Sequence, residues 1–295
     1  MKTGTYDVIV IGGGAAGLSA ALVLGRARRR VVVIDSGEPR NAPAAHMHGY
    51  LSRDGMSPAD LLQRGREEAG SYGVEVVSGL VVSVDPGFSV RLGGGESMAA
   101  RRLLLATGAT DVLPRIPGAL ERWGRDFLHC PYCHGWEVRD QPLGVLSTGA
   151  GSAEHAHLLR QWSGDVVFFT HTYELPEVER EQLEARGIRV VDGEVQLLVV
   201  ERDSLTGVAL EDGRVIGRKA LFIRPYMRPR GGDLLEQIGC DVDDLGFVRV
   251  DSGGRTSVAG VWAAGNVANP RAQVITAAGE GSAAAIAINA DLVPA

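Results

Sequence analysis

The chain has 295 residues, of which 45% are hydrophobic, 22% are charged and three are cysteines. This is the composition of an ordinary globular protein long enough for two domains, and three cysteines are too few, and odd in number, for a disulfide scaffold. The formal net charge of −6 gives no general attraction to nucleic acid or to an anionic membrane surface, and no apolar run approaches the roughly 20 residues that cross a bilayer.

The N-terminus leads from Lys2 almost directly into an expected strand, without a cleavable leader, so we expect a cytoplasmic protein. Residues 6–11 are an apolar run typical of a buried parallel strand, and residues 18–24 are rich in alanine and leucine, as in a helix. Between them lies Gly12-Gly13-Gly14-Ala15-Ala16-Gly17. Gly12 permits a tight turn, Gly14 lets a pyrophosphate approach the backbone, and Gly17 lets helix and strand pack closely.

A second expected strand, residues 30–34, ends at Asp35, eighteen residues after Gly17. A carboxylate at this position can accept hydrogen bonds from a ribose, so the pattern predicts a dinucleotide site. A glycine-rich turn without a ligand is the alternative. The pattern leaves open whether the dinucleotide is FAD or NAD. Two later segments favour FAD: residues 103–109, Leu-Leu-Leu-Ala-Thr-Gly-Ala, and residues 260–266, Gly-Val-Trp-Ala-Ala-Gly-Asn.

The close cysteine pair lies in residues 130–134, Cys-Pro-Tyr-Cys-His. If Cys130 lies at a helix start, where Pro131 suits the first helical position, the two sulfurs meet on one face and can close a small disulfide ring. A thiol there has a lowered pKa and forms more of the thiolate that attacks disulfides. Half a zinc site or two inert thiols are the alternatives. His129 and His134 flank the pair, but adjacent residues cannot easily converge on one ion, so we expect no metal.

A second strand and glycine turn follow, and they match the dinucleotide pattern poorly. After the expected strand at residues 144–146 comes Ser147-Thr148-Gly149-Ala150-Gly151-Ser152, with Ser147 in the place of the first glycine. If Gly149 and Gly151 are counted as the glycine pair instead, the third position falls on Glu154. Its charge near the helix start would oppose a pyrophosphate.

These pieces, in this order around a CxxC, resemble the low-molecular-weight thioredoxin reductase family of flavoproteins over essentially the whole chain. The resemblance implies an α/β fold with two Rossmann-like nucleotide-binding domains. An FAD domain, residues 1–116 and 246–295, would be interrupted by an inserted NAD(P)-type domain, residues 117–245, that carries the CxxC. It also implies a homodimer.

By resemblance, the FAD site is built from the first glycine turn, the end of the next strand and its loop, the Ala-Thr-Gly and Ala-Ala-Gly-Asn segments, and the start of a C-terminal helix. The residues are Gly12, Gly14, Ala15, Ala16, Gly17, Asp35, Arg40, Asn41, His48, Ala106, Thr107, Gly108, Gly265, Asn266, Gln273 and Val274. The family usually has Gly-Asp where this chain has Gly265-Asn266, and asparagine can still hydrogen-bond a ribityl hydroxyl. Of the loop histidines, His48 is a better candidate for a flavin contact than His46; each could instead be an ordinary loop residue.

The resemblance also implies a catalytic set of Cys130, Cys133 and His134, in which Cys133 lies next to the flavin and Cys130 meets the substrate. His134 stands where thioredoxin reductases carry an aspartic acid. An imidazole can deprotonate a thiol near neutral pH better than a low-pKa carboxylate can, although a helix residue without a catalytic role is the alternative. Residues 129–137, His-Cys-Pro-Tyr-Cys-His-Gly-Trp-Glu, are similar to thiol oxidases that close disulfides in small natural products, such as the gliotoxin and holomycin enzymes.

After a further expected strand, residues 166–170, the chain has His171-Thr172-Tyr173-Glu174 where an NADPH-binding member of the family would carry an arginine pair for the 2′-phosphate. We therefore expect poor NADPH binding, with O2 as the simplest electron acceptor and H2O2 as its product. The expected function is an FAD-dependent oxidase that forms an intramolecular disulfide in a small dithiol, as in antibiotic biosynthesis. A thioredoxin reductase using NADPH or another donor, and a flavoprotein redox sensor, are the alternatives.

Two remaining features concern the substrate and the third cysteine. Tyr132, Trp136 and Trp123 lie near the dithiol in sequence, which is compatible with a hydrophobic substrate or with ordinary core packing. Cys240 has no local partner and is expected to be structural.

Overall fold

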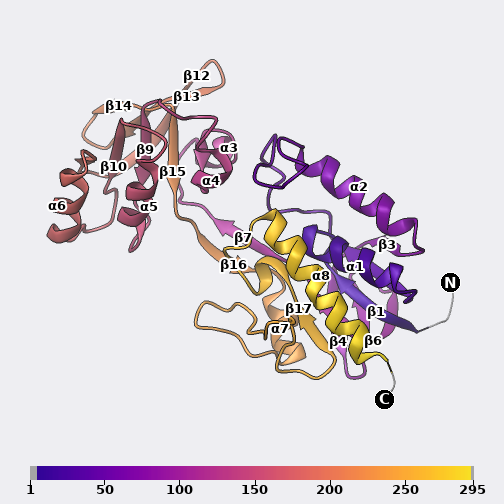
Figure 1. The fold of residues 1–295 in the computed structure, drawn as a ribbon. Helices are drawn as coiled ribbons and strands as arrows, with labels where there is room; N and C mark the ends of the chain where they lie inside the picture. Colours follow the sequence, from indigo (N-terminus) through magenta and orange to yellow (C-terminus); the bar gives the residue numbers. More distant parts are fainter. Residues whose placement is uncertain (1–4, 294–295) are drawn as a thin grey trace. The chain divides into compact units, whose positions relative to one another are not determined.

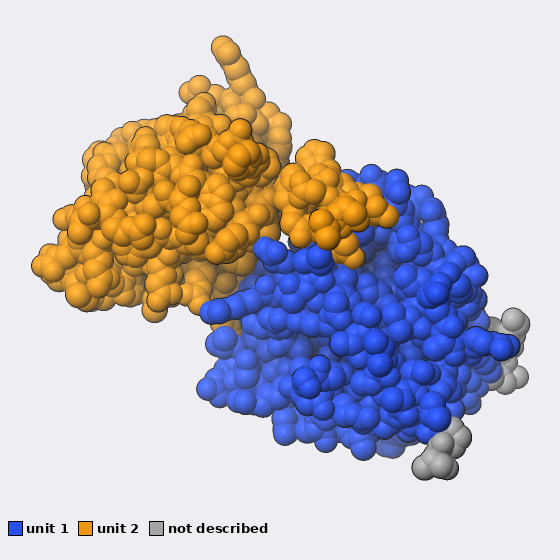
Figure 2. Space-filling model, in the orientation of Figure 1, with its two compact units in different colours: residues 1–42, 57–110, 227–295 blue, residues 43–56, 111–226 orange. Residues whose placement is uncertain are grey.

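The computed structural model describes residues 5–293, which form two compact units. Unit 1 comprises residues 1–42, 57–110 and 227–295, and unit 2 comprises residues 43–56 and 111–226 (Figure 2). The chain changes unit four times: on either side of residues 43–56, and within the short strands β7 (Ala109–Val112) and β16 (Tyr226–Pro229). No helix of the described residues is long and apolar enough to cross a membrane.

Unit 1 contains a seven-stranded sheet with the order β3-β2-β1-β6-β5-β4, in which β17 also pairs with β6. The parallel strands are β1 (Tyr6–Ile11), β2 (Val31–Asp35), β3 (Glu75–Ser78), β6 (Ser97–Leu105) and β17 (Val261–Ala263). An antiparallel extension is formed by β4 (Val81–Asp85) and β5 (Ser89–Leu92). Because β2, β1, β6 and β17 are parallel, the segments that follow their carboxyl ends share one edge of the sheet.

Helices pack on both faces of this sheet, because its strands direct apolar side chains to both sides. One core contains residues of α1 (Ala15–Arg26) and α8 (Val274–Asp291), and the other contains residues of α7 (Gly232–Ile238). Helices α1 and α8 lie side by side (Figure 1), and a Cβ at Gly281 would lie 2.0 Å from the carbonyl oxygen of Ala16. Glycine at position 281 is therefore what permits the close approach of the two helices. The remaining elements are α2 (Pro58–Gly70) and the 3-10 helix η1 (Gly265–Val267).

Unit 2 is built on a five-stranded parallel sheet with the order β11-β10-β9-β15-β8. Its strands are β8 (Phe127–Leu128), β9 (Leu143–Leu146), β10 (Val166–Phe169), β11 (Arg189–Val191) and β15 (Ala220–Ile223). Its helices are α3 (Ala119–Arg122), α4 (Pro131–His134), α5 (Ser152–Leu159) and α6 (Glu177–Ala185). A three-stranded antiparallel sheet consists of β12 (Val195–Glu201), β13 (Ser204–Leu210) and β14 (Val215–Gly217). The predicted α/β fold with two Rossmann-like sheets is confirmed.

The limits of the units differ from the inserted domain expected at residues 117–245. Residues 227–245 belong to unit 1 because Leu234 and Leu235 of α7, together with Cys240, are buried in its core. Residues 43–56 belong to unit 2, where Pro43 packs so tightly on Gly124 that a Cβ there would meet the proline ring at 2.9 Å. Both differences come from long-range packing that no local sequence pattern reports.

Candidate active site

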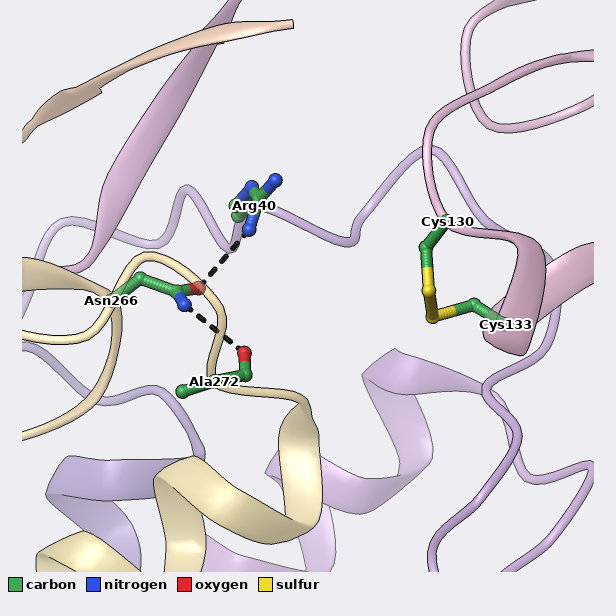
Figure 3. The surroundings of a disulfide bond; sticks show 5 residues. All are labelled: Arg40, Cys130, Cys133, Asn266 and Ala272. Carbon is green, nitrogen blue, oxygen red and sulfur yellow. Dashed lines mark hydrogen bonds between the residues drawn. A yellow bond between two sulfur atoms is a disulfide. The ribbon is translucent and has the colours of Figure 1, made fainter. Parts of the chain in front are cut away.

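The two cysteines of the CxxC form a disulfide at the start of a single helical turn (Figure 3). Cys130 is the N-cap of α4, Pro131 is the first helical residue, and the Cα atoms of Cys130 and Cys133 lie 5.2 Å apart. The carbonyl oxygen of Cys130 accepts hydrogen bonds from the backbone N–H groups of Cys133 and His134, at 3.1 and 3.2 Å. This turn holds both sulfurs on one side, which is the arrangement that the spacing and the proline predict.

His134 ends this turn in a partly buried position. Burial lowers the pKa of His134 below its ordinary value because it disfavours the charged imidazolium; the nearby carboxylate of Glu137 raises it, and the nearby His48 lowers it. The ring is therefore neutral around pH 7 and has a nitrogen free to accept a proton, as its expected role as a base requires.

The structure brings His48 to the CxxC segment and leaves His46 outside it. Nε2 of His48 lies 3.5 Å from Oε1 of Glu137, and its Nδ1 lies 3.2 Å from Oδ2 of Asp54. His46 is exposed and contacts the carbonyl oxygen of Gly55 at 3.1 Å. The expected flavin contact of His48 stays a prediction. Glu137, which ends the nine-residue string at 129–137, was not singled out from the sequence, and Asp54 has no sequence signal.

In unit 1, the first glycine turn follows β1 as expected. Gly12 has φ = 110°, and a Cβ there would lie 2.2 Å from the carbonyl oxygen of Ala106; a Cβ at Gly17 would lie 1.9 Å from that of Gly12. By contrast, Gly14 faces open space, with no heavy atom within 4 Å of where its Cβ would lie. Gly14 caps α1 without a side-chain hydrogen bond, and the first turn holds no acid. The N–H groups at the start of α1 are thus open to a phosphate, so this turn fits the pyrophosphate of a dinucleotide.

Asp35 ends β2 and is tied to the same turn. Its Oδ1 accepts from the backbone N–H of Gly13 at 3.1 Å, and its Oδ2 accepts from Arg66 of α2 at 3.0 Å. A carboxylate has about four lone-pair sites, so these two bonds leave acceptor capacity for a ribose. Arg66, which orients the carboxylate, was not singled out from the sequence.

Asn266 has a local structural reason to be an amide. Its Nδ2 donates to the carbonyl oxygens of Asn269 and Ala272, both at 3.0 Å, and its Oδ1 accepts from Arg40 at 3.3 Å (Figure 3). An aspartate, as the family usually has here, could only accept and would face two carbonyl oxygens. The Oδ1 retains a second lone pair for a ribityl hydroxyl.

The other residues expected at the FAD site follow the same sheet edge or the start of α8. Thr107 Oγ1 donates to the carbonyl oxygen of Arg230 at 2.8 Å, and the carbonyl oxygen of Gly108 accepts from the backbone N–H of Arg230 at 2.9 Å. The segment around Gly265 is anchored by a residue that the sequence did not indicate: Glu280 of α8 accepts from the N–H of Gly265 at 2.9 Å and from Asn269 at 2.6 Å. The remaining expected residues lie in the first turn of α1, at the N-terminus of α8 and beside Arg40: Ala15, Ala16, Gln273, Val274 and Asn41.

The second glycine turn, between β9 and α5, is contacted by other groups of the protein. A Cβ at Gly151, the N-cap of α5, would lie 1.9 Å from Nη1 of Arg224, so this guanidinium lies directly against the turn. Thr148 donates its hydroxyl to the carbonyl oxygen of Arg224 at 2.6 Å, and its N–H donates to Oγ of Ser152 at 3.1 Å. Glu154 lies in the first turn of α5, as the sequence indicates. The second turn thus differs from the first, because a guanidinium at the flexible end of a side chain lies against its last glycine.

His171 stands where the family's NADPH site has arginine, and its ring nitrogen already has a hydrogen-bond partner within the protein. Its Nδ1 accepts from the backbone N–H of Val195 at 3.0 Å, and burial lowers its pKa. A neutral histidine that already holds a backbone N–H cannot replace a guanidinium as a phosphate ligand.

Cys240 and the aromatic residues near the dithiol are placed as follows. Cys240 is free and buried, and burial raises the pKa of its thiol.

Trp123 packs on Phe127 with ring centroids 5.6 Å apart, whereas Tyr132 and Trp136 are 63% and 65% exposed. The Tyr132 ring also packs edge-on against Trp162, with centroids 5.6 Å apart, so packing between rings accounts for Trp123 and Tyr132 and not for Trp136. Among the described residues, no group of three or more His, Cys, Asp or Glu side chains is arranged to hold a metal ion.

Comparison with known proteins identifies relatives along nearly the whole chain. Residues 6–281 match the family described as pyridine nucleotide-disulphide oxidoreductase. Thioredoxin reductase sirT of Leptosphaeria maculans is 34% identical over 309 residues, covering 96% of this chain and 93% of the relative. Thioredoxin reductase tcpT of Claviceps purpurea is 33% identical, covering 88% and 86%. The crystal structure of HlmI superposes with a TM-score of 0.96 at 55% identity, covering 99% of this chain and 94% of that one.

Proposed function

The chain belongs to the pyridine nucleotide-disulphide oxidoreductase family, and we propose that within it the protein is an FAD-dependent dithiol oxidase that closes a disulfide in a small molecule. The proposal includes a homodimer and a cytoplasmic location. Bound FAD would take up the electron pair that leaves the dithiol and transfer it to O2, giving H2O2. FAD would be held at the first glycine turn and at the residues that follow the carboxyl ends of β2, β6 and β17.

The cysteine pair would carry the exchange steps. One substrate thiolate attacks Sγ of Cys130, forming a mixed disulfide and breaking the Cys130–Cys133 bond, so that Cys133 leaves as a thiolate. The second substrate thiolate attacks the substrate sulfur of the mixed disulfide, which forms the product disulfide and releases Cys130. The substrate loses two electrons and two protons, and the enzyme disulfide gains the two electrons. His134 would accept a substrate proton because its partly buried ring is neutral.

The direction of the reaction rests on the second glycine turn. A reductase needs an electron donor, and in this family a pyridine nucleotide would bind at that turn. Here Glu154 lies in the first turn of the helix that follows, and His171 accepts a backbone N–H where an arginine would contact the 2′-phosphate. This arrangement supports electron entry from a dithiol over electron entry from NADPH.

A thioredoxin reductase is the second candidate, and the names of the fungal relatives favour it. It would run the same exchange in reverse on a protein disulfide and would require a donor other than a normally bound NADPH.

An anaerobic titration of the yellow protein separates these functions. We expect a small aliphatic dithiol to bleach the flavin and admitted air to restore it with stoichiometric H2O2, whereas NADPH leaves the spectrum unchanged. Cys130→Ser and Cys133→Ser should remain yellow and lose dithiol-dependent oxygen consumption, while the control Cys240→Ser keeps it. Bleaching by NADPH would support the reductase instead. A single bleaching without repeated peroxide formation would indicate a redox sensor, and normal oxygen consumption by either active-site variant would overturn the scheme.

A further inference from the structure

Arg230, which follows β16 in unit 1, was not among the residues that the sequence indicated for the FAD site. Its backbone N–H donates to the carbonyl oxygen of Gly108 at 2.9 Å, and its own carbonyl oxygen accepts from Oγ1 of Thr107 at 2.8 Å. The backbone of Arg230 is therefore fixed to the segment that follows β6.

The guanidinium of Arg230 reaches from this anchor to a second segment. Its Nε donates to Oγ1 of Thr110 at 2.8 Å, and its Nη1 donates to the carbonyl oxygen of Glu38. Thr110 belongs to the same segment as Gly108, whereas Glu38 follows the carboxyl end of β2. One side chain thus bonds to both segments, and all of these residues belong to unit 1.

The sheet order determines what lies between the two segments. β1 pairs with β2 on one side and with β6 on the other, and all three strands are parallel. The segments after β2 and β6 therefore begin two strand spacings apart, about 10 Å, with the first glycine turn between them. A dinucleotide binds outside the carboxyl ends of such strands. Arg230 therefore connects the two segments that flank the expected FAD position.

The segment after β2 has a second contact with the same sheet edge. Arg40 donates to Oδ1 of Asn266 at 3.3 Å, and Asn266 follows β17, which pairs with β6 (Figure 3). The segment is thus bonded at Glu38 to Arg230 and at Arg40 to Asn266. Both contacts join protein groups, so they restrict the segment independently of any ligand.

We propose that Arg230 is a positioning residue of the FAD site, which holds the segments after β2 and β6 in place for the cofactor. The inference rests on the proposed function, because it takes FAD as the ligand of the first glycine turn. Ordering a loose segment on binding costs conformational entropy, and a segment that is already held avoids this cost. Arg230 therefore strengthens FAD binding, and no chemical step is assigned to it.

The test compares FAD binding by Arg230→Met and Arg29→Met. Methionine removes the side-chain donors of residue 230 and leaves its two backbone hydrogen bonds in place. Arg29 is the matched control because its Nε also donates to a side-chain oxygen, Oδ1 of Asn289 at 2.7 Å, and its Nη2 to a backbone carbonyl, that of Asn289 at 3.4 Å. It precedes β2, at the opposite end of that strand. We expect equilibrium dialysis to give a Kd for FAD that is about tenfold higher in Arg230→Met and unchanged in Arg29→Met.

Two further variants test the bond itself. Thr110→Val removes the acceptor of Nε and should weaken FAD binding less than Arg230→Met does. The double variant should bind FAD as Arg230→Met does, because the bond between the two side chains is already lost. Arg230→Lys, which has a single ammonium for two acceptors, should have an intermediate Kd. Amide hydrogen exchange gives a readout without turnover: residues 36–42 should exchange faster in Arg230→Met and at the wild-type rate in Arg29→Met.

A Kd that changes by less than about twofold in Arg230→Met overturns the proposal, and so does an equal loss of affinity in Arg29→Met. If Arg230→Met does not fold, Arg230→Lys and Thr110→Val give the same comparison. Dialysis and hydrogen exchange need no dithiol. A wild-type protein that binds FAD through Arg230 as expected, yet does not oxidise dithiols, would contradict the proposed oxidase alone.

Discussion

Asn266 stands where the family usually has aspartate, and its side-chain amide is held by local hydrogen bonds. Both hydrogens of its side-chain amide are donated to the backbone carbonyls of Asn269 and Ala272. The sequence indicated a neutral substitute for an aspartate that could still contact a ribityl hydroxyl. It could not indicate that the neutral amide is required locally, because the two carbonyls are brought to it only by the turn between η1 and α8.

Asn266→Asp should therefore destabilise unit 1. The change removes two hydrogen bonds and places a carboxylate against two carbonyl oxygens, which should lower the free energy of unfolding by about 1–3 kcal/mol. Asn289→Asp is the matched control, since Oδ1 of Asn289 accepts from Arg29 at 2.7 Å and a carboxylate would keep that bond. Denaturant unfolding measures both variants; equal stability of the two would show that the amide of Asn266 is not required.

The buried His155 should make the stability of the folded protein depend on pH. Burial lowers its pKa to about 4, although a hydrogen bond to the backbone of His129 opposes the shift. Between the ordinary value near 6.5 and about 4, the unfolded chain binds the proton and the folded chain does not. The stabilisation from this histidine is therefore fully present above about pH 6.5 and is lost as the pH falls toward 4, by about 3 kcal/mol in total.

Chemical denaturation between pH 4 and 7 measures this contribution. His155→Gln, which cannot become charged, should reduce the slope of stability against pH, whereas the exposed His46→Gln should keep the wild-type slope. An unchanged slope in His155→Gln would contradict the buried neutral histidine.

At the scale of elements, the strand–turn–helix unit of β1 and α1 is specified locally. An apolar run, three glycines and an alanine-rich stretch follow one another without interruption, and each part has the conformation that its residues favour. The second unit, β9 and α5, has a similar outline, but Arg224 from the end of β15 lies against its turn. The sequence at 147–152 matches the dinucleotide pattern poorly, and the group that lies against Gly151 comes 73 positions further along the chain.

Substitutions at two glycines of the first turn should affect FAD binding and protein stability separately. Gly14→Ala places a methyl group in open space at a position with φ = −78°, so the fold should persist while FAD binding weakens at least tenfold. Gly12→Ala would force a Cβ to within 2.2 Å of the Ala106 carbonyl at φ = 110°, which should lower stability by more than about 3 kcal/mol.

FAD content per protein, from absorbance, and thermal unfolding of the apoprotein give the two readouts. Full FAD occupancy in Gly14→Ala would show that the open turn does not hold the cofactor. A Gly12→Ala protein as stable as the wild type would show that the tight turn tolerates a side chain.

At the scale of the whole molecule, the order of motifs correctly predicted two Rossmann-like units with one inserted into the other. The expected limits at residues 116–117 and 245–246 differ from those of the units, because contacts between residues far apart in sequence decide which unit a segment joins. Leu234 and Leu235 of α7 enter the core of unit 1 after the chain has already returned through β16, and the segment at 43–56 joins unit 2 although it lies between β2 and α2.

The sequence by itself determined the features written in consecutive residues: the parallel strands, the first glycine turn, the disulfide of Cys130 and Cys133 at a helix start, and the family. These follow from hydrophobic periodicity, glycine conformation and cysteine spacing, which act over a few residues. The tertiary structure alone decided that Glu137 lies beside a loop histidine, that Arg224 lies against the second turn and that Glu280 anchors Gly265. Those contacts join residues far apart in sequence, and only the packing of sheets and helices determines which of them meet.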